Sequence, residues 1–120
     1  MKADTNIGFI GLGNVGAKLA NSLLIANYNL FVYDLDKSKS NDLVKKGGIF
    51  WENLKEITLN SSIIITCLPS PKSVENVIEG NNVIINYINS DHLRIELSTT
   101  DQFEMIRLSN LFIEKKAKKL

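Results

Sequence analysis

The sequence predicts one α/β domain built on a doubly wound parallel sheet. Short β-branched or aromatic segments alternate about five times with segments of helical periodicity. The connections between these segments are too short for anything but right-handed βαβ units. A chain of 120 residues, 44% of them hydrophobic, suffices for one packed domain and leaves no room for a second. We therefore expect residues 1–120 to form a single domain.

The first three elements follow from local composition and periodicity. Residues 7–10 are apolar, and the segment is too short and too rich in glycine for a helix, so it favours a buried strand. Apolar side chains recur at helical spacing from Asn14 to about Ala26, which predicts an amphipathic helix. Residues 30–33, Leu-Phe-Val-Tyr, are aromatic and β-branched and indicate a second strand.

The next segment is expected to hold a capped helix, a short strand and a second, brief helix. Asp36 can cap a helix that continues past Val44, and the glycine pair at 47–48 would end it. Residues 49–50 follow as a short third strand, and a brief helix is expected near 53–57.

The strongest predicted strand lies at 61–68. Its continuous run of Ile-Ile-Ile-Thr-Cys-Leu indicates burial on both faces, as at the centre of a parallel sheet. Ser70 and Pro71 then form a typical helix start, with an N-cap residue followed by proline at the first helical position. This helix is expected to reach about residue 78.

The C-terminal third is less regular. Residues 80–92 have no clear pattern, whereas 93–97 alternate strictly between apolar and polar. The fifth strand should therefore have one polar face and lie near an edge of the sheet. A last helix is expected from Asp101, where Asp101 and Glu104 can form a capping box, to a solvated, lysine-rich end at 115–119.

Composition excludes several classes of function. The 14 basic and 13 acidic residues nearly cancel, so composition offers no electrostatic footprint for nucleic acid or an anionic membrane. The longest apolar runs are too short to span a bilayer. The N-terminus meets the first strand with no cleavable hydrophobic stretch before it, which predicts a cytoplasmic protein.

Neither the single histidine nor the single cysteine is assigned a chemical role. His92 has no partners at the spacing of metal ligands or a catalytic triad, so we expect a loop histidine. Cys67 lies in the strongest strand and is expected to be an inert core residue; alone, it excludes a disulfide framework and a cysteine-based zinc site. We expect no metal site.

One glycine-rich motif indicates a binding function. It directly follows the first predicted strand and opens the first helix, and an acidic residue, Asp34, closes the second strand about 20 residues further on. A glycine pattern alone is weak, but this combination of strand, helix and acid is typical of dinucleotide binding. The motif consists of Gly11, Leu12, Gly13, Asn14, Val15 and Gly16.

Each motif position has a physical role in this interpretation. Gly11 permits a tight turn, Gly13 lets a pyrophosphate approach the backbone, and Gly16 lets the helix pack closely on the sheet. The phosphates would accept hydrogen bonds from free N–H groups at the helix N-terminus. Asp34 would accept hydrogen bonds from the adenosine ribose hydroxyls. The alternative is that the glycines only make a tight turn and that Asp34 caps a local backbone group.

The expected cofactor is NAD, with NADP less favoured. Asp34 would meet a 2′-phosphate with like charge, and no arginine lies nearby to offset it. Lys37 and Lys39 are the cations that could still accommodate a 2′-phosphate.

Residues 6–100 resemble the cofactor domain of the β-hydroxyacid dehydrogenases, the group of 3-hydroxyisobutyrate, tartronate semialdehyde and 6-phosphogluconate dehydrogenases. The resemblance is carried by 7–16, which contains the glycine motif, by Thr-Cys-Leu-Pro at 66–69, and by Glu-Leu-Ser-Thr at 96–99. It implies a Rossmann fold that binds NAD or NADP. It further implies that Leu68, Pro69 and Thr99 border the cofactor, near its nicotinamide half. Simple packing of Leu68 and a helix cap at Thr99 are the alternatives.

The sequence also departs from this family. Family members continue into a substrate-binding strand, a helix with a catalytic lysine, and an all-helical domain, and none of these motifs is present here. We therefore expect a truncated dehydrogenase domain of about five strands, with the sixth strand and the helical domain missing and no catalytic residue assigned. The exposed sheet edge would favour self-association or pairing with the missing C-terminal portion. A stand-alone, non-enzymatic nucleotide-binding module is the alternative.

Overall fold

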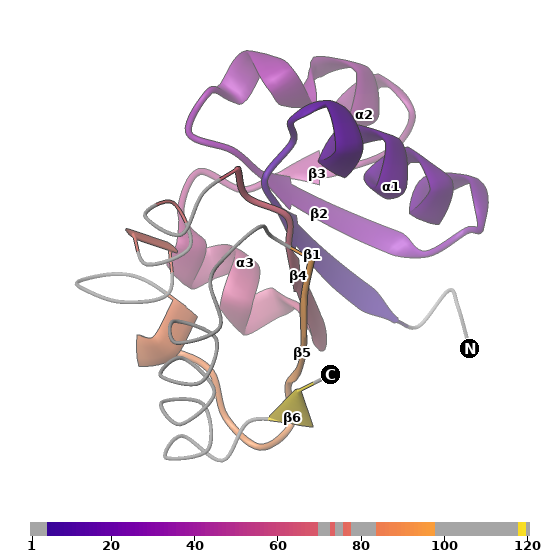
Figure 1. Cartoon of the computed structure of the whole chain (residues 1–120). Coiled ribbons are helices and arrows are strands. Elements are labelled where there is room, and N and C mark those ends of the chain that lie inside the picture. The colour runs from indigo at the N-terminus through magenta and orange to yellow at the C-terminus, as the bar shows by residue number, and fades with distance from the viewer. Residues whose placement is uncertain (1–4, 70–72, 74–75, 78–83, 98–117, 120) are drawn as a thin grey trace.

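In the computed structural model, which describes residues 5–69, 73, 76–77, 84–97 and 118–119, the strands form one parallel sheet (Figure 1). The strand order is β3-β2-β1-β4-β5-β6. The chain therefore builds outward from β1 in one direction and then, starting at β4, in the other. The strands are β1 (Asn6–Ile10), β2 (Asn29–Tyr33), β3 (Ile49–Phe50), β4 (Ile63–Thr66), β5 (Leu93–Glu96) and β6 (Lys118–Lys119).

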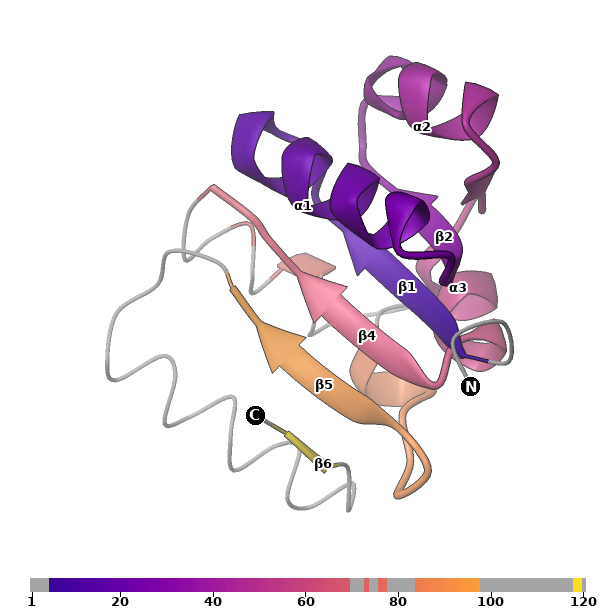
Figure 2. The same cartoon turned by 90° about the vertical axis from the view of Figure 1, so that its right-hand side faces the viewer.

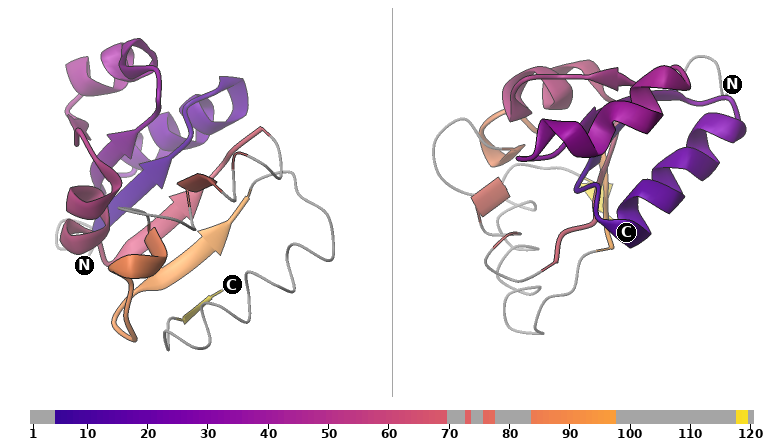
Figure 3. Two further views of the ribbon diagram at one scale, coloured as in Figure 1. Left: turned by 90° about the vertical axis from the view of Figure 1, so that its left-hand side faces the viewer. Right: turned by 90° about the horizontal axis from the view of Figure 1, so that it is seen from above.

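Helices cover both faces of this sheet. Figure 2 shows α1 on the near side of β1 and α3 behind it, and Figure 3 shows the sheet from the opposite side and from above. The helices are α1 (Asn14–Ile25), η2 (Lys37–Ser40), α2 (Asn41–Lys45), α3 (Leu54–Asn60) and η3 (Ile84–Asn86). The sequence-predicted doubly wound α/β fold is therefore confirmed.

The core consists of two apolar clusters, one on each face of the sheet. Successive residues of β1 point to opposite faces. Phe9 is fully buried in the cluster that includes Ala20 of α1, whereas Ile10 lies in the cluster that includes Ile57 of α3. Burial of β1 and β4 on both sides matches the continuous apolar runs of these segments.

Most predicted boundaries in the N-terminal half are correct to within one residue. Asp36 caps η2 by accepting a hydrogen bond from the Ser38 N–H, and Gly47 ends α2 with a φ of 109°. The brief helix expected near 53–57 is longer than predicted. It continues to Asn60, and its N-terminus is capped by Asn53, whose Oδ1 accepts from the Glu56 N–H at 2.8 Å.

Strand β4 is shorter than the predicted 61–68. It begins at Ile63 and ends at Thr66. The Cys67 N–H still donates to the Ile10 carbonyl at 2.8 Å, but Pro69 has no N–H with which to extend the ladder. Of the helix predicted from Ser70, the structure describes residues 73 and 76–77, which are helical.

The expectation that the sixth strand is missing is wrong. Lys118 and Lys119 form β6 and pair in parallel with Leu93 and Arg94 of β5 (Figure 2). These lysines therefore belong to a strand and not to a solvated helix end. The physical reason is that the outer side of β5 presents backbone N–H and C=O groups that need hydrogen-bond partners. The helix predicted from Asp101, and Thr99, lie outside the described residues.

The polar face of β5 is buried, contrary to the expectation from its alternating sequence. Arg94 is 2% exposed and forms an ion pair with Glu96, whose side chain is 1% exposed. The Thr66 hydroxyl donates to the same carboxylate at 2.6 Å. Burial holds the pKa of the Arg94 guanidinium below its ordinary value, and the carboxylate of Glu96 offsets part of this shift. A buried charge is tolerated when it is paired and hydrogen-bonded, so this face does not need solvent.

His92 lies in the loop before β5, as expected for a loop histidine, and it is 6% exposed. The Asn89 N–H donates to Nδ1 at 2.9 Å, so Nε2 carries the hydrogen and donates to the Thr58 carbonyl at 2.9 Å. The imidazole thus connects the turn before β5 to α3.

Replacing His92 with Phe should lower the free energy of unfolding by about 1–3 kcal/mol, because the carbonyl of the buried Thr58 loses its hydrogen-bond donor. Urea denaturation followed by circular dichroism measures the change. Asp91→Ala is the matched control: Asp91 is exposed and uses its backbone N–H to bind Asn89, so its stability should change by less than about 0.5 kcal/mol. Equal stability of His92→Phe and wild type would contradict this role.

Candidate dinucleotide-binding site

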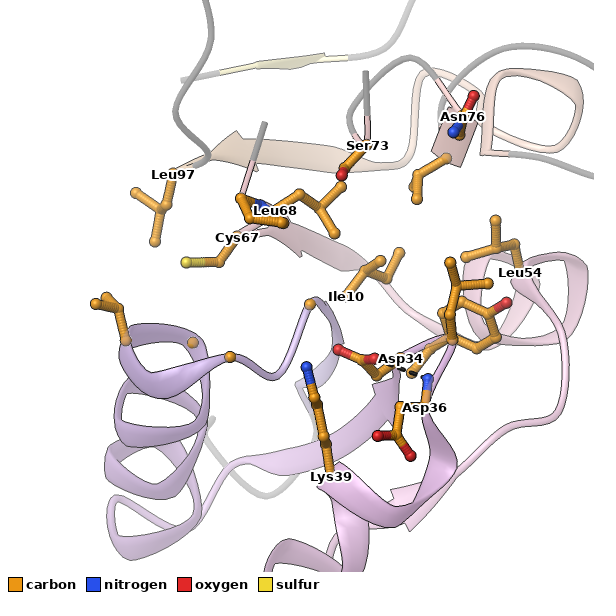
Figure 4. A pocket seen from close by; sticks show the side chains of 18 of the residues that line it. Ile10, Asp34, Asp36, Lys39, Leu54, Cys67, Leu68, Ser73, Asn76 and Leu97 are labelled. Carbon is orange, nitrogen blue, oxygen red and sulfur yellow. Dashed lines mark hydrogen bonds between the residues drawn. The ribbon is translucent and has the colours of Figure 1, made fainter. Parts of the chain in front are cut away.

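A cavity of about 910 Å³ opens at the carboxyl ends of β1, β2 and β4 (Figure 4). This is the point at which the strand order reverses direction, because β1 lies between β2 and β4. Ligands of open α/β sheets bind at such a position, since loops on the two sides of the reversal separate there. The cavity lies between the loop after β1 and the residues that follow β4.

The loop after β1 is shaped by very close backbone contacts. Gly11 has a φ of 102°, and a Cβ atom at this position would lie 2.2 Å from the Cys67 carbonyl oxygen. A Cβ atom at Gly16 would lie 2.2 Å from the Gly11 carbonyl oxygen. Both positions therefore require glycine, Gly11 for its turn and its contact with the end of β4, Gly16 for the contact between α1 and the loop.

Gly13 differs from both, because a Cβ atom there would have no atom within 4 Å. Gly13 lines the cavity and is the N-cap residue of α1, and no side chain caps this helix in the part of the chain that the structure describes. The first N–H groups of a helix have no intrahelical partner. Together with the helix dipole they make this end of α1, next to Asn14 and Val15, suitable for an anion such as a pyrophosphate.

Asp34 follows β2 and faces the same cavity. Its Oδ2 accepts a hydrogen bond from the Leu12 N–H at 2.8 Å, and its Oδ1 accepts one from the Asp36 N–H at 2.9 Å. Asp34 therefore does bind local backbone groups, as the alternative interpretation expected. An ionised carboxylate has about four acceptor positions, so two remain for a ligand.

The other predicted site residues fall into three groups. Asn14, Val15, Leu68 and Pro69 line the cavity. The Leu12 side chain is 3% exposed and belongs to the core, so this residue reaches the site only through its backbone N–H. Thr99 lies outside the described residues.

Cys67 packs against the core as expected, but it is not fully buried within a strand. It lies just beyond the end of β4, is half-buried, and lines the cavity together with Leu97 (Figure 4). Burial raises the pKa of the Cys67 thiol, and the negative charge of Glu96 raises it further. The thiol is therefore protonated at neutral pH.

Sequence reasoning missed several residues of the cavity wall. Leu35, which is 90% exposed, directly follows Asp34, and Ser73 and Asn76 face the cavity from the helical residues after β4 (Figure 4). Their place after the ends of β2 and β4 was the available signal, because ligands of such sheets bind beyond the strand ends. Of the two lysines considered for a 2′-phosphate, Lys39 lines the cavity, whereas Lys37 pairs with Glu52 at 2.8 Å.

Among the described residues, no group of three or more histidine, cysteine, aspartate or glutamate side chains could hold a metal ion. None of the helices in that part of the chain is long and apolar enough to cross a membrane.

A family model, the NAD binding domain of 6-phosphogluconate dehydrogenase, matches residues 6–120. The chain belongs to this family. It has the NAD(P)-binding domain of a hydroxyacid dehydrogenase-type oxidoreductase, as the resemblance of its three motifs implied.

Relatives of this NAD(P)-binding domain are named 3-hydroxyisobutyrate dehydrogenases. A probable mitochondrial 3-hydroxyisobutyrate dehydrogenase of Dictyostelium discoideum is 36% identical over 95 residues, which are 79% of this chain and 30% of the relative. The mitochondrial 3-hydroxyisobutyrate dehydrogenase of Drosophila melanogaster is 35% identical over 94 residues, 78% of this chain and 28% of the relative. The chain thus spans about a third of the length of the curated relatives it matches.

Solved structures share the fold at lower identity. The 3-hydroxyisobutyrate dehydrogenase of Mycobacterium tuberculosis matches with a TM-score of 0.86 and 22% identity over 96% of this chain and 38% of that one. Two imine reductase structures from Myxococcus stipitatus, one with NAD+ and one with NADP+, match with TM-scores of 0.88 and 0.87. They are 18% and 17% identical and cover 99% and 96% of this chain, and 40% and 39% of theirs.

Gly13→Val should separate ligand binding from folding in this NAD(P)-binding domain. The new side chain enters open space, so the free energy of unfolding should change by less than about 1 kcal/mol. It would occupy the position expected for the pyrophosphate, so calorimetry should show NAD affinity falling by more than about a hundredfold. Gly16→Ala is the contrasting variant, because its Cβ meets the Gly11 carbonyl and should destabilise the fold itself. Wild-type NAD affinity in folded Gly13→Val would exclude a phosphate site here.

Cys67 should report occupation of the cavity. The raised pKa leaves little thiolate at neutral pH, so iodoacetamide should alkylate Cys67 several-fold more slowly than in the urea-unfolded chain. Raising the pH toward the elevated pKa should speed the reaction, and saturating NAD should slow it. Since the chain has one cysteine, mass spectrometry measures each rate directly. Equal rates in the folded and unfolded chain would show that the thiol is not shielded.

Proposed function

We propose that residues 1–120 form one domain that binds NAD in preference to NADP in the cavity beyond β1, β2 and β4. The observation that carries this proposal is the position of Asp34 beside the N-terminus of α1, on one cavity wall. The helix end offers N–H groups to two phosphates, and the carboxylate offers acceptors to the hydroxyl groups of a ribose.

The residues of this site fit such a cofactor. The open space at Gly13, which a larger side chain would fill, gives the pyrophosphate access to the backbone. The two remaining acceptor positions of Asp34 suit the 2′- and 3′-hydroxyls of the adenosine ribose, and they would repel a 2′-phosphate. Lys39 is the cavity residue that works against this preference. Leu68 and Pro69, and Thr99 according to the sequence, would border the nicotinamide half.

We further propose that this domain serves an oxidoreductase that acts on a 3-hydroxy acid. The names of its relatives support this substrate class. Bound NAD would supply the hydride acceptor. The residues of this chain would hold the cofactor and exclude water from one side of it, while a proton-transfer group comes from elsewhere in the enzyme.

Two of the sequence-based predictions remain predictions. Self-association, or pairing with a further C-terminal portion, is supported by exposed apolar side chains next to the cavity: Val15 is 65% exposed and Leu97 is 49% exposed. The cytoplasmic location rests on the sequence alone.

Titration calorimetry with NAD and NADP tests the proposal. Wild type should bind NAD more tightly than NADP. Asp34→Ala should weaken NAD binding by roughly ten- to a hundredfold, because hydrogen bonds to a charged group are worth about 1.5–3 kcal/mol. It should also narrow the difference between the two cofactors.

Asp42→Ala is the matched control for this titration. It removes the same charge from an exposed position on α2 that does not line the cavity, so cofactor affinity should stay within about twofold of wild type. Tighter binding of NADP than NAD by wild type would overturn the assignment of the cofactor.

A further inference from the structure

The carboxylate of Asp34 bridges two loops that are far apart in the sequence. Oδ2 accepts from the N–H of Leu12, 22 residues earlier, at 2.8 Å, and Oδ1 accepts from the N–H of Asp36 at 2.9 Å. The two bonds differ in their surroundings, because Leu12 is 3% exposed whereas Asp36 is exposed to solvent. Water therefore reaches the Asp36 N–H more easily than the Leu12 N–H.

The loop that contains Leu12 lies against the ends of β2 and β4. Its first residue, Gly11, donates to the Tyr33 carbonyl at 3.0 Å and has a φ of 102°, which glycine adopts readily. A buried N–H without an acceptor costs about 1–3 kcal/mol, so removing the acceptor of Leu12 would favour a different loop conformation. The N–H groups at the start of α1 follow directly after this loop.

We propose that Asp34 is a positioning residue for the phosphate-binding loop, in addition to its contact with the ribose. Its Oδ2 fixes the Leu12 N–H toward β2 and so keeps Gly13 and the N-terminus of α1 facing the cavity. This inference rests on the proposed dinucleotide site. Through the loop, Asp34 strengthens phosphate binding, whereas its negative charge weakens it.

Two variants of equal charge separate these effects. Asp34→Asn and Asp34→Ala both remove the negative charge, which by itself should strengthen the binding of an anion. Only Asp34→Asn retains a carbonyl oxygen. That oxygen should turn toward the buried Leu12 N–H, since water can serve the exposed Asp36 N–H. The difference between the two variants therefore measures the acceptor alone.

Inorganic pyrophosphate is the probe, because it has no ribose to contact Asp34. Calorimetry should show that Asp34→Asn binds pyrophosphate at least as tightly as wild type, and that Asp34→Ala binds it about five- to tenfold more weakly than Asp34→Asn. Both variants are compared well below their melting temperatures, so a loss of global stability does not change the result. Equal affinity of the two variants would overturn the proposal.

The interaction between Leu12 and Asp34 can also be measured in the wild-type chain, so the test does not depend on a variant that folds. Nuclear magnetic resonance should show a scalar coupling across the hydrogen bond between the Leu12 amide nitrogen and the side-chain carboxyl carbon of Asp34. Absence of this coupling would overturn the proposal. If wild type binds neither NAD nor pyrophosphate, the proposed function fails. If it binds both while the two variants bind pyrophosphate equally, only the positioning role fails.

Discussion

The close approach of three backbone segments at the end of β1 determines the rest of this structure. The loop at Gly11 lies against the Cys67 carbonyl, and α1 lies against the Gly11 carbonyl, in both cases too close for a Cβ atom. This contact fixes where α1 starts and therefore where its free N–H groups point. It also brings the residues after β4 to the opposite side of the cavity. The site consequently depends on backbone geometry more than on any single side chain.

The site combines a partly positive helix end with a negative carboxylate. The N-terminus of α1 favours an anion, whereas the Asp34 carboxylate a short distance away disfavours one. Asp34 accepts hydrogen bonds from two backbone N–H groups, which use part of its acceptor capacity. The remaining acceptor positions can bind neutral hydroxyl groups. The charges of Arg94 and Glu96 neutralise each other below the surface. A dinucleotide, with charged phosphates and uncharged ribose hydroxyls, suits this distribution.

Local patterns predicted most of the fold and the core of the site. The glycine motif, the strand before it and the helix after it are encoded by neighbouring residues, so their places in the chain could be inferred. Pairings between distant segments could not. The pairing of β6 with β5 and the hydrogen bond between Leu12 and Asp34 connect residues that only the fold brings together. The ion pair of Arg94 and Glu96 depends on burial, which the alternating sequence of β5 does not show. Cys67 was misplaced because an apolar run does not show at which residue a strand ends.

The two halves of the site differ in how well they tolerate amino-acid substitution. The part proposed to bind phosphate is made of backbone atoms held by Gly11 and Gly16, and a Cβ atom at either of these two glycines would collide with a carbonyl oxygen. The part proposed to bind the ribose consists of side chains on the exposed turn between Asp34 and Lys39, which has room for substitution. Preference for one dinucleotide over another can therefore change through this turn while the phosphate loop stays the same. Asp34 is the exception, because its hydrogen bond with the Leu12 N–H connects this turn to the glycine loop. A change of cofactor preference at this position must also replace the acceptor for the Leu12 N–H.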